Sequence, residues 1–183
     1  EGIIKDYIGC AKKAFGVEKF YIQQRKNART KNVRMIKREI IKFLEKNSPE
    51  IFEKRLPSFV YNLDKKYVRY LVRALFNGDG NFYYSKNVAR IIFSFGEKKL
   101  AEDLQDLLLI KFGIFSKIRR DRNCFRLVIE RREEIEKYFK LIGFDLRYKE
   151  EVENYLKNAK KSKIHSVPYG KEIVKEICRI LGK

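Results

Sequence analysis

The stretch Leu71–Tyr84, LVRALFNGDGNFYY, places one carboxylate, Asp79, between two glycines. Pairs such as Asn-Gly and Asp-Gly are common turn signals, so one interpretation is a simple turn. The other is chemical, because apolar residues recur with helical spacing over residues 66–77 and put Asp79 at a helix C-terminus. The helix dipole disfavours a carboxylate there by about 0.3–1 kcal/mol, and a divalent cation reverses that effect. Asp79 is therefore a candidate metal ligand.

Two small residues precede this carboxylate on the same helical face. Ala74 and Gly78 are four residues apart, and side chains this small allow a second helix to pack closely, although a buried helix end would explain them equally well. Two such helices side by side would bring together two aspartates and nearby carbonyl oxygens, a donor set suited to Mg²⁺. We expect Asp79 and Gly78 to bind Mg²⁺ or Mn²⁺ together with a second, equivalent helix end.

The segments that must position this motif follow a regular order. A helix at 66–77 precedes strands in NFYYS and VARIIFSF, with a turn at Lys86 and Asn87. A helix in EKKLAEDLQDLLLIKFG, ended by Gly113, leads to strands in IFSKIRR and CFRLVIE and to a helix ended by Gly143. The order αββαββα predicts an α+β fold with antiparallel sheets.

The N-terminal part repeats the second half of that order. YIGCAKKAFGVEKFYIQQ matches LQDLLLIKFGIFSKIRR, and VRMIKREIIKFLEK matches LVIERREEIEKYFK. A shift that lays Glu39 on Glu134 also lays Lys54 on Lys149, so each lysine follows the last helix of its unit. By this count the first helix and first two strands of the first unit would lie upstream of Glu1. We expect either a longer chain or a partner chain to supply them.

Charge is the strongest compositional signal. The chain has 43 Lys+Arg against 24 Asp+Glu, a formal net charge of +19, and a sequence pI near 9.8. Such an excess in a folded protein favours a nucleic acid partner, whereas a Lys- and Glu-rich thermophile surface would balance its signs. No apolar run spans a bilayer and no signal peptide is visible, so we expect a cytoplasmic protein. Three widely spaced cysteines and one histidine, His165, predict buried free thiols rather than a disulfide or a zinc site.

The motif, the element order and the two lysines resemble the LAGLIDADG homing endonucleases, most closely the two-motif kind carried in archaeal inteins. KRLP at residues 54–57 and VPYGKEIVKEI after the second unit are similar to intein endonuclease sequence as well. The resemblance implies that Asp79 holds the catalytic metal and that Lys54 and Lys149 are the basic residues beside the active sites. The motif has Asn77 and Ala74 where the family more often has aspartate and glycine.

In that family strand pairs form saddle-shaped sheets that lie on double-stranded DNA with a long asymmetric target site. Residues 25–38 contain seven basic residues among fourteen and no acid, and residues 117–126 repeat this basic character. Alternation along strands suggests which side chains face DNA, although ordinary charged hairpin tips would have a similar composition. The candidates are Gln23, Arg25, Asn27, Arg29, Asn32, Arg34, Tyr83, Ser85, Arg90, Lys117, Arg119, Arg122, Asn123 and Arg126.

The resemblance divides the chain into three parts. Residues 1–57 are the C-terminal part of a first LAGLIDADG half, 58–149 a complete second half, and 150–183 a basic linker and C-terminal helix. The implied activity is site-specific, Mg²⁺-dependent cleavage of phosphodiester bonds by a monomer with two halves. The alternative is a non-catalytic DNA- or RNA-binding protein on the same scaffold: a maturase, a regulator or a decayed endonuclease.

Overall fold

The computed structural model of the chain describes residues 2–24, 31–85, 88–144, 146–158 and 178–180. Two compact units divide the chain at Glu53 and Lys54, and each is described by itself. The expected order of helices and strands is confirmed in both units. The predicted strand turn at residues 86–87, the C-terminal linker and most of the predicted last helix lie outside the described residues.

The described residues of unit 1 form two helices and one strand pair. Helix α1 (Gly2–Phe15) is followed by β1 (Tyr21–Gln24), β2 (Lys31–Arg34) and α2 (Arg38–Asn47), and a short 3-10 turn, η1 (Pro49–Ile51), follows α2. The two strands pair antiparallel, with Gln23 opposite Asn32. The Lys37 ammonium donates a hydrogen bond to the Phe15 carbonyl at 3.2 Å, which ties the start of α2 to the end of α1.

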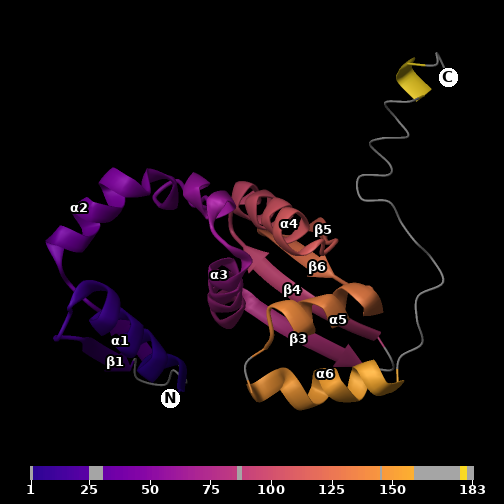
Figure 1. The fold of residues 1–183 in the computed structure, drawn as a ribbon, viewed down its shortest axis with the longest axis horizontal. Helices are drawn as coiled ribbons and strands as arrows, with labels where there is room; N and C mark the ends of the chain where they lie inside the picture. Colours follow the sequence, from indigo (N-terminus) through magenta and orange to yellow (C-terminus); the bar gives the residue numbers. More distant parts are fainter. Residues whose placement is uncertain (1, 25–30, 86–87, 145, 159–177, 181–183) are drawn as a thin grey trace. The chain divides into compact units, whose positions relative to one another are not determined.

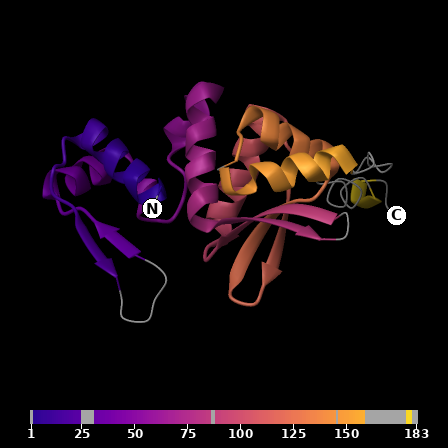
Figure 2. The ribbon, with the colours of Figure 1, turned by 90° about the horizontal axis from the view of Figure 1, so that it is seen from below.

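Unit 2 is built on a four-stranded antiparallel sheet in the order β3-β4-β6-β5. After the 3-10 turn η2 (Ser58–Asn62) come α3 (Lys65–Asp79), β3 (Gly80–Ser85), β4 (Val88–Phe95) and α4 (Lys98–Phe112). Strands β5 (Lys117–Asp121) and β6 (Cys124–Ile129) precede α5 (Arg132–Leu141) and α6 (Leu146–Asn158). Figure 1 labels these elements, and Figure 2 shows the helices of unit 2 on one side of its sheet.

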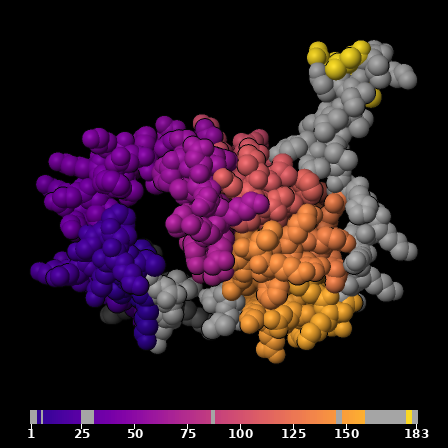
Figure 3. Space-filling view, in the orientation of Figure 1, coloured from indigo at the N-terminus to yellow at the C-terminus, as the bar shows by residue number. Residues whose placement is uncertain are grey.

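The core of unit 2 lies between that helix layer and one face of the sheet. Odd-numbered residues of β4, from Ala89 to Phe95, are buried. Ile91 and Phe93 lie opposite Ile129 and Leu127 of β6. Leu104, Leu107 and Leu108 of α4 complete the core with no exposed surface, because their spacing puts them on one helical face. Figure 3 shows α5 and α6 of the helix layer side by side at the surface of unit 2.

A glycine ends the corresponding helix in each unit. Gly16 after α1 and Gly113 after α4 have φ angles of 59° and 62°, the left-handed conformation that glycine adopts without strain. Gly113 therefore stops α4 at the residue predicted from the sequence. The shared Phe-Gly ending supports the internal repeat between α1–α2 and α4–α5.

The cysteines are free, but they are less buried than expected. Cys10 is exposed, and Cys124 and Cys178 are only partly covered. Cys124 lies on β6 and its thiol is 3.2 Å from the Asp121 carbonyl oxygen across the hairpin turn. His165 lies outside the described residues. Among the described helices, none combines the length and apolar character needed to cross a membrane.

Candidate functional site

Asp79 is the last residue of α3, so it lies at a helix C-terminus as the helical spacing predicts, and the alternative interpretation of a simple turn is wrong. The helix continues through Asn77 and Gly78, and β3 begins directly at Gly80, whose backbone is extended. A Cβ atom at residue 80 would collide with the ring and carbonyl of Phe76, so the direct passage from helix to strand requires glycine there. The Asp79 side chain is exposed at this junction.

The small residues of α3 face outward, away from the core of unit 2. Val68, Val72 and Phe76 form the buried face, whereas Ala74 and Gly78 are exposed. Apart from its chain neighbours and the backbone of its own helix, no described atom lies within 4 Å of a Cβ placed on Gly78. We call Tyr67, Tyr70, Ala74 and Gly78 the outer face of α3, because these residues are exposed at helical spacing. The alternative explanation for the small residues, a buried helix end, is wrong because Ala74 and Gly78 are exposed.

An aromatic cluster fixes the end of α3 that carries Asp79. Phe76 has no exposed surface and its ring contacts those of Phe93, Tyr138, Phe144 and Tyr148 at centroid distances of 5.6, 6.1, 5.2 and 5.6 Å. The Tyr148 hydroxyl, 3.1 Å from Asn81 Oδ1, donates a hydrogen bond to it. The first part of α6 is thereby held against the junction of α3 and β3.

This cluster explains the position of one predicted lysine. Lys149 follows Tyr148 directly on α6 and is exposed, so its backbone lies near the α3–β3 junction. It follows α5, as the sequence predicts, and lies within the next helix, α6. Lys54 is also exposed, at 68% of its side chain, and its ammonium lies 3.4 Å from Glu97 Oε1. Among the described residues, no hydrogen bond or ion pair joins either lysine to Asp79.

The segment after Lys54 is anchored by a buried carboxylate on α4. Asp103 accepts hydrogen bonds from the Arg55 guanidinium at 2.7 and 3.2 Å and from the Leu56 amide at 3.0 Å. The Tyr61 hydroxyl donates to the Asp103 carbonyl at 2.9 Å. Asp103 is 6% exposed, so these contacts replace its lost hydration and hold residues 55–61 on α4.

This anchor predicts a loss of stability at high pH. Burial, followed by the Asp103 charge, raises the pKa of Tyr61 from 10.0 to about 12. Between these values the unfolded chain loses the phenolic proton first, so stability present below pH 10 falls as the pH rises towards 12. Tyr61→Phe should lessen this fall, measured as urea midpoints at about pH 8 and about pH 11. Part of the fall in stability should persist in the variant, because the pKa values of Tyr138 and Tyr155 are raised as well. An equal fall in both proteins would show that Tyr61 is not its source.

The open face of the sheet in unit 2 gathers six of the predicted DNA-binding residues. Backbone pairing places Tyr83 opposite Arg90 and Ser85 opposite Val88. The same alternation continues through Arg126, which pairs with Ser94 on one side and Arg119 on the other. We call this surface the open face, and Figure 2 shows it turned away from the helices of unit 2. Its predicted members are Tyr83, Ser85, Arg90, Lys117, Arg119 and Arg126.

The remaining predicted residues are distributed over two hairpins. Arg122 and Asn123 form the exposed turn between β5 and β6, and Arg122 has a left-handed φ of 49°. In unit 1, strand pairing places Gln23, Asn32 and Arg34 on one face of the two-stranded sheet, and all three are exposed. Arg25, Asn27 and Arg29 lie outside the described residues.

Two acidic residues on the open face were absent from the sequence prediction. Glu130 follows β6 and accepts hydrogen bonds from Lys117 at 3.0 Å and from Arg119 at 2.9 and 3.0 Å. Asp121 is paired with Arg126 at 2.5 Å. The alternation of CFRLVIE puts Glu130 in step with Arg126, so the strand pattern contained the signal.

The residues around Asp79 do not make a complete metal site by themselves. Within the described part of the chain, no group of three or more His, Cys, Asp or Glu side chains is arranged to hold a metal ion. Asp79 and the Gly78 carbonyl supply oxygen donors of the type that Mg²⁺ prefers, but further carboxylates are needed to complete the site. A metal held by Asp79 and Gly78 together with a second helix end therefore stays a prediction.

Comparison with known proteins agrees with this architecture. The family described as a LAGLIDADG-like domain matches residues 66–143. Full-length DUF199/WhiA from Thermatoga maritima is similar in structure, with a TM-score of 0.56 and 15% sequence identity, over 98% of this chain and 55% of that one. At this identity the likeness concerns the fold alone.

Similar segments occur within longer proteins of unrelated names. DNA-directed RNA polymerase subunit Rpo1C of Methanocaldococcus jannaschii is 30% identical over 67% of this chain, and the probable translation initiation factor IF-2 of Thermococcus kodakarensis is 33% identical over 62%. DNA polymerase II large subunit of Thermococcus kodakarensis is 39% identical over 41%. The matches span only 14%, 10% and 4% of those relatives. The family match and the agreement in fold establish that the chain contains a LAGLIDADG-like domain, at residues 66–143.

Proposed function

We propose that the chain forms part of a site-specific double-strand DNA endonuclease of the LAGLIDADG type. The observation that carries this proposal is the open face, where Arg90, Lys117, Arg119 and Arg126 lie on one uncovered sheet surface with Tyr83 and Ser85. Strand pairs can enter a DNA major groove, arginine reads guanine edges, and lysine holds phosphates. In unit 1, Gln23, Asn32 and Arg34 would make contacts of the same kind with DNA.

Cleavage would take place at the C-terminal end of α3. Asp79 and the Gly78 carbonyl would hold their share of Mg²⁺ or Mn²⁺, which when bound neutralises phosphate charge and activates water. A second helix packed on the outer face of α3 would bring the missing carboxylate, because Ala74 and Gly78 leave room for a close backbone approach. Lys149, held near this junction through Tyr148, would stabilise charge on the phosphate, and Lys54 would do so in the other half.

An origin inside a host protein accounts for the pattern of relatives. An RNA polymerase subunit, a translation factor and a DNA polymerase subunit have no common activity in their names, yet each contains a similar segment covering 4–14% of its length. A mobile inserted element produces that distribution, so we propose that the chain is the endonuclease part of an intein. Residues 1–57 would then belong to its first half and 58–149 to its second.

The second candidate is a DNA- or RNA-binding protein that no longer cleaves. Asn77, at a motif position where the family more often has aspartate, favours it. This candidate predicts binding on the same open face and no cleavage with either metal. Cleavage and binding assays on one preparation therefore separate the two candidates.

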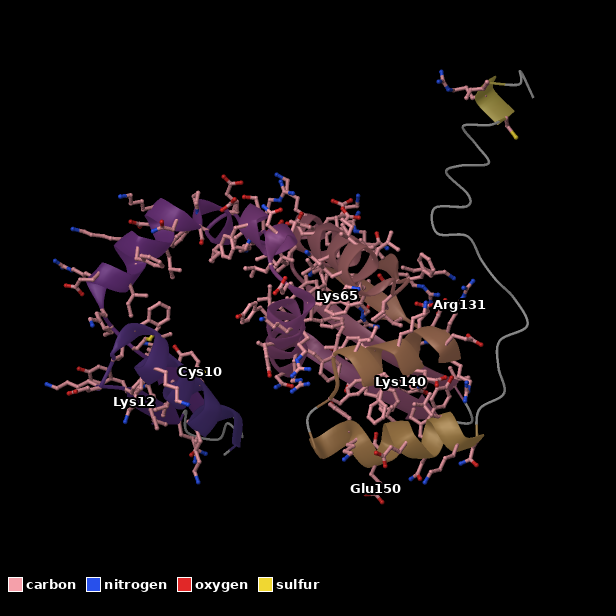
Figure 4. All side chains as sticks on the ribbon, in the orientation of Figure 1. Cys10, Lys12, Lys65, Arg131, Lys140 and Glu150 are labelled. Carbon is pink, nitrogen blue, oxygen red and sulfur yellow. The ribbon has the colours of Figure 1, made fainter. Side chains whose placement is uncertain are left out.

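Charge removal on opposite sides of unit 2 tests the DNA surface. The variant Lys117→Gln with Arg126→Gln, on the open face, should weaken duplex DNA binding at least about threefold and make its salt dependence shallower. Most of this effect should come from Arg126, because Glu130 already holds Lys117 at 3.0 Å. The matched variant Lys98→Gln with Lys140→Gln removes two cations from the helix layer, where Figure 4 labels Lys140 on α5. Fluorescence anisotropy with duplex DNA and with RNA measures both. Equal losses in the two variants would refute binding on the open face.

A further inference from the structure

Glu130 is an anion at the centre of the basic open face. It follows β6, the strand that lies between β4 and β5, and its side chain is 23% exposed. Its carboxylate contacts Lys117 and Arg119 from β5 at 3.0 and 2.9 Å and lies 3.9 Å from Arg90 Nε on β4. The Glu130 carboxylate thus forms ion pairs with three cations, which come from the two strands on either side of β6.

The cations around Glu130 favour its ionised form. Partial burial alone would raise the pKa of Glu130, but the Lys117 hydrogen bond and the charges of Arg119, Lys117 and Arg90 outweigh it and hold the pKa below its usual value. Arg119 contacts both carboxylate oxygens through one terminal nitrogen, Nη2. Arg90 Nε lies 3.9 Å from Glu130 Oε2. This nitrogen is buried and has no hydrogen-bond partner among the described residues, so the Arg90 guanidinium lies close to Glu130 but keeps an unpaired donor.

Glu130 also limits the net charge of the surface that would face DNA. Arg90, Lys117, Arg119 and Arg126 contribute four positive charges there, and Glu130 and Asp121 remove two of them. The whole chain, by contrast, has 43 basic residues against 24 acidic ones. A phosphate that approaches this region must compete with a carboxylate already in place for the same donors.

We propose that Glu130 is a specificity-determining positioning residue. It holds Arg90 and Arg119 over the open face with their remaining donors available for base edges, and it keeps Lys117 and the two arginines from binding any passing phosphate. Its expected effect is lower affinity for DNA of arbitrary sequence, in the way that unfavourable charge excludes wrong partners at other interfaces. The inference rests on the proposed DNA binding by the open face.

The test compares two isosteric variants of the full chain. Glu130→Gln removes the central acid, and Glu136→Gln removes an acid with two cationic partners, Arg132 at 3.1 Å and Lys140 at 2.7 Å, in the helix layer. Both change the net charge by the same amount. The probe is a short DNA duplex of random sequence, and its affinity is measured by fluorescence anisotropy over a range of salt concentrations. Far-UV circular dichroism and thermal melting verify that both variants are folded.

The expected result is a gain in random-sequence affinity for Glu130→Gln only. Its affinity should rise about 3- to 10-fold and its salt slope should steepen by about 0.9, the value for one additional phosphate contact. Adding Lys117→Gln to Glu130→Gln should remove most of the gain, because the freed ammonium is then absent. A merely structural role would leave the salt slope unchanged.

Three results would overturn the inference. Equal affinities and slopes for the two variants would mean that Glu130 acts only through net charge. Weaker binding by Glu130→Gln would mean that the carboxylate contacts DNA itself or supports the sheet. If the wild-type chain binds no duplex DNA even at low salt, the proposed function fails and this inference fails with it, whereas the first two results leave DNA binding intact.

Discussion

Asp79→Asn should abolish metal-dependent cleavage of duplex DNA, with a loss of at least about 10³-fold, while the affinity for DNA changes by less than about twofold. The amide keeps the size of the carboxylate but loses the charge that binds a divalent cation. The side chain is exposed at the end of α3 and takes no part in the core, so folding should be preserved. The measurement is cleavage of a duplex library with Mg²⁺ or Mn²⁺, in protein that provides a second motif helix, alongside DNA affinity.

The same helix offers a matched control for this variant. Asp64 precedes α3 at its other end, is exposed, and is paired only weakly with Lys66 at 3.6 Å. Asp64→Asn makes the identical chemical change and should leave both cleavage and binding almost unaltered. Undiminished cleavage by Asp79→Asn would exclude this residue as the metal ligand, and loss of cleavage in both variants would point to charge rather than position.

Phe76→Ala should lower the free energy of unfolding of unit 2 by about 3–5 kcal/mol. The ring has no exposed surface and contacts four other aromatic rings, so truncation removes its burial and leaves a cavity between α3, α5 and α6. Urea denaturation of the full chain followed by tyrosine fluorescence measures the effect, because Tyr138 and Tyr148 report on this cluster. Because the chain has two compact units, the unfolding transition of unit 2 must be separated from that of unit 1 before its free energy of unfolding is calculated.

Tyr67→Ala provides the control on the same helix. Tyr67 lies on the outer face of α3 and is 56% exposed, so its removal should cost less than about 1 kcal/mol. Similar costs for Phe76→Ala and Tyr67→Ala would mean that the aromatic cluster does not determine the stability of this region. Because the cluster also holds α6 beside the α3–β3 junction, Phe76→Ala should disturb the position of Lys149 as well.

Residues whose role follows from local pattern could be predicted from the sequence. Helical spacing indicated α3 and α4, and Gly113 ended α4 where a left-handed residue was needed. Alternation placed Arg90, Lys117 and Arg126 on one side of their strands, and the strand pairing confirms a common face. These features depend on neighbours two to four residues apart, so the chain encodes them directly.

The sequence by itself therefore determined the order of the elements, the motif that carries Asp79 and the excess of positive charge. The tertiary structure decided what comes together across long separations. In the structure α3 continues to Asp79 and is followed directly by β3. Tyr148 packs against Phe76, and Glu130 lies between Arg90 and Arg119. Strand order and helix packing create these contacts through burial of the whole core, and no local spacing specifies them.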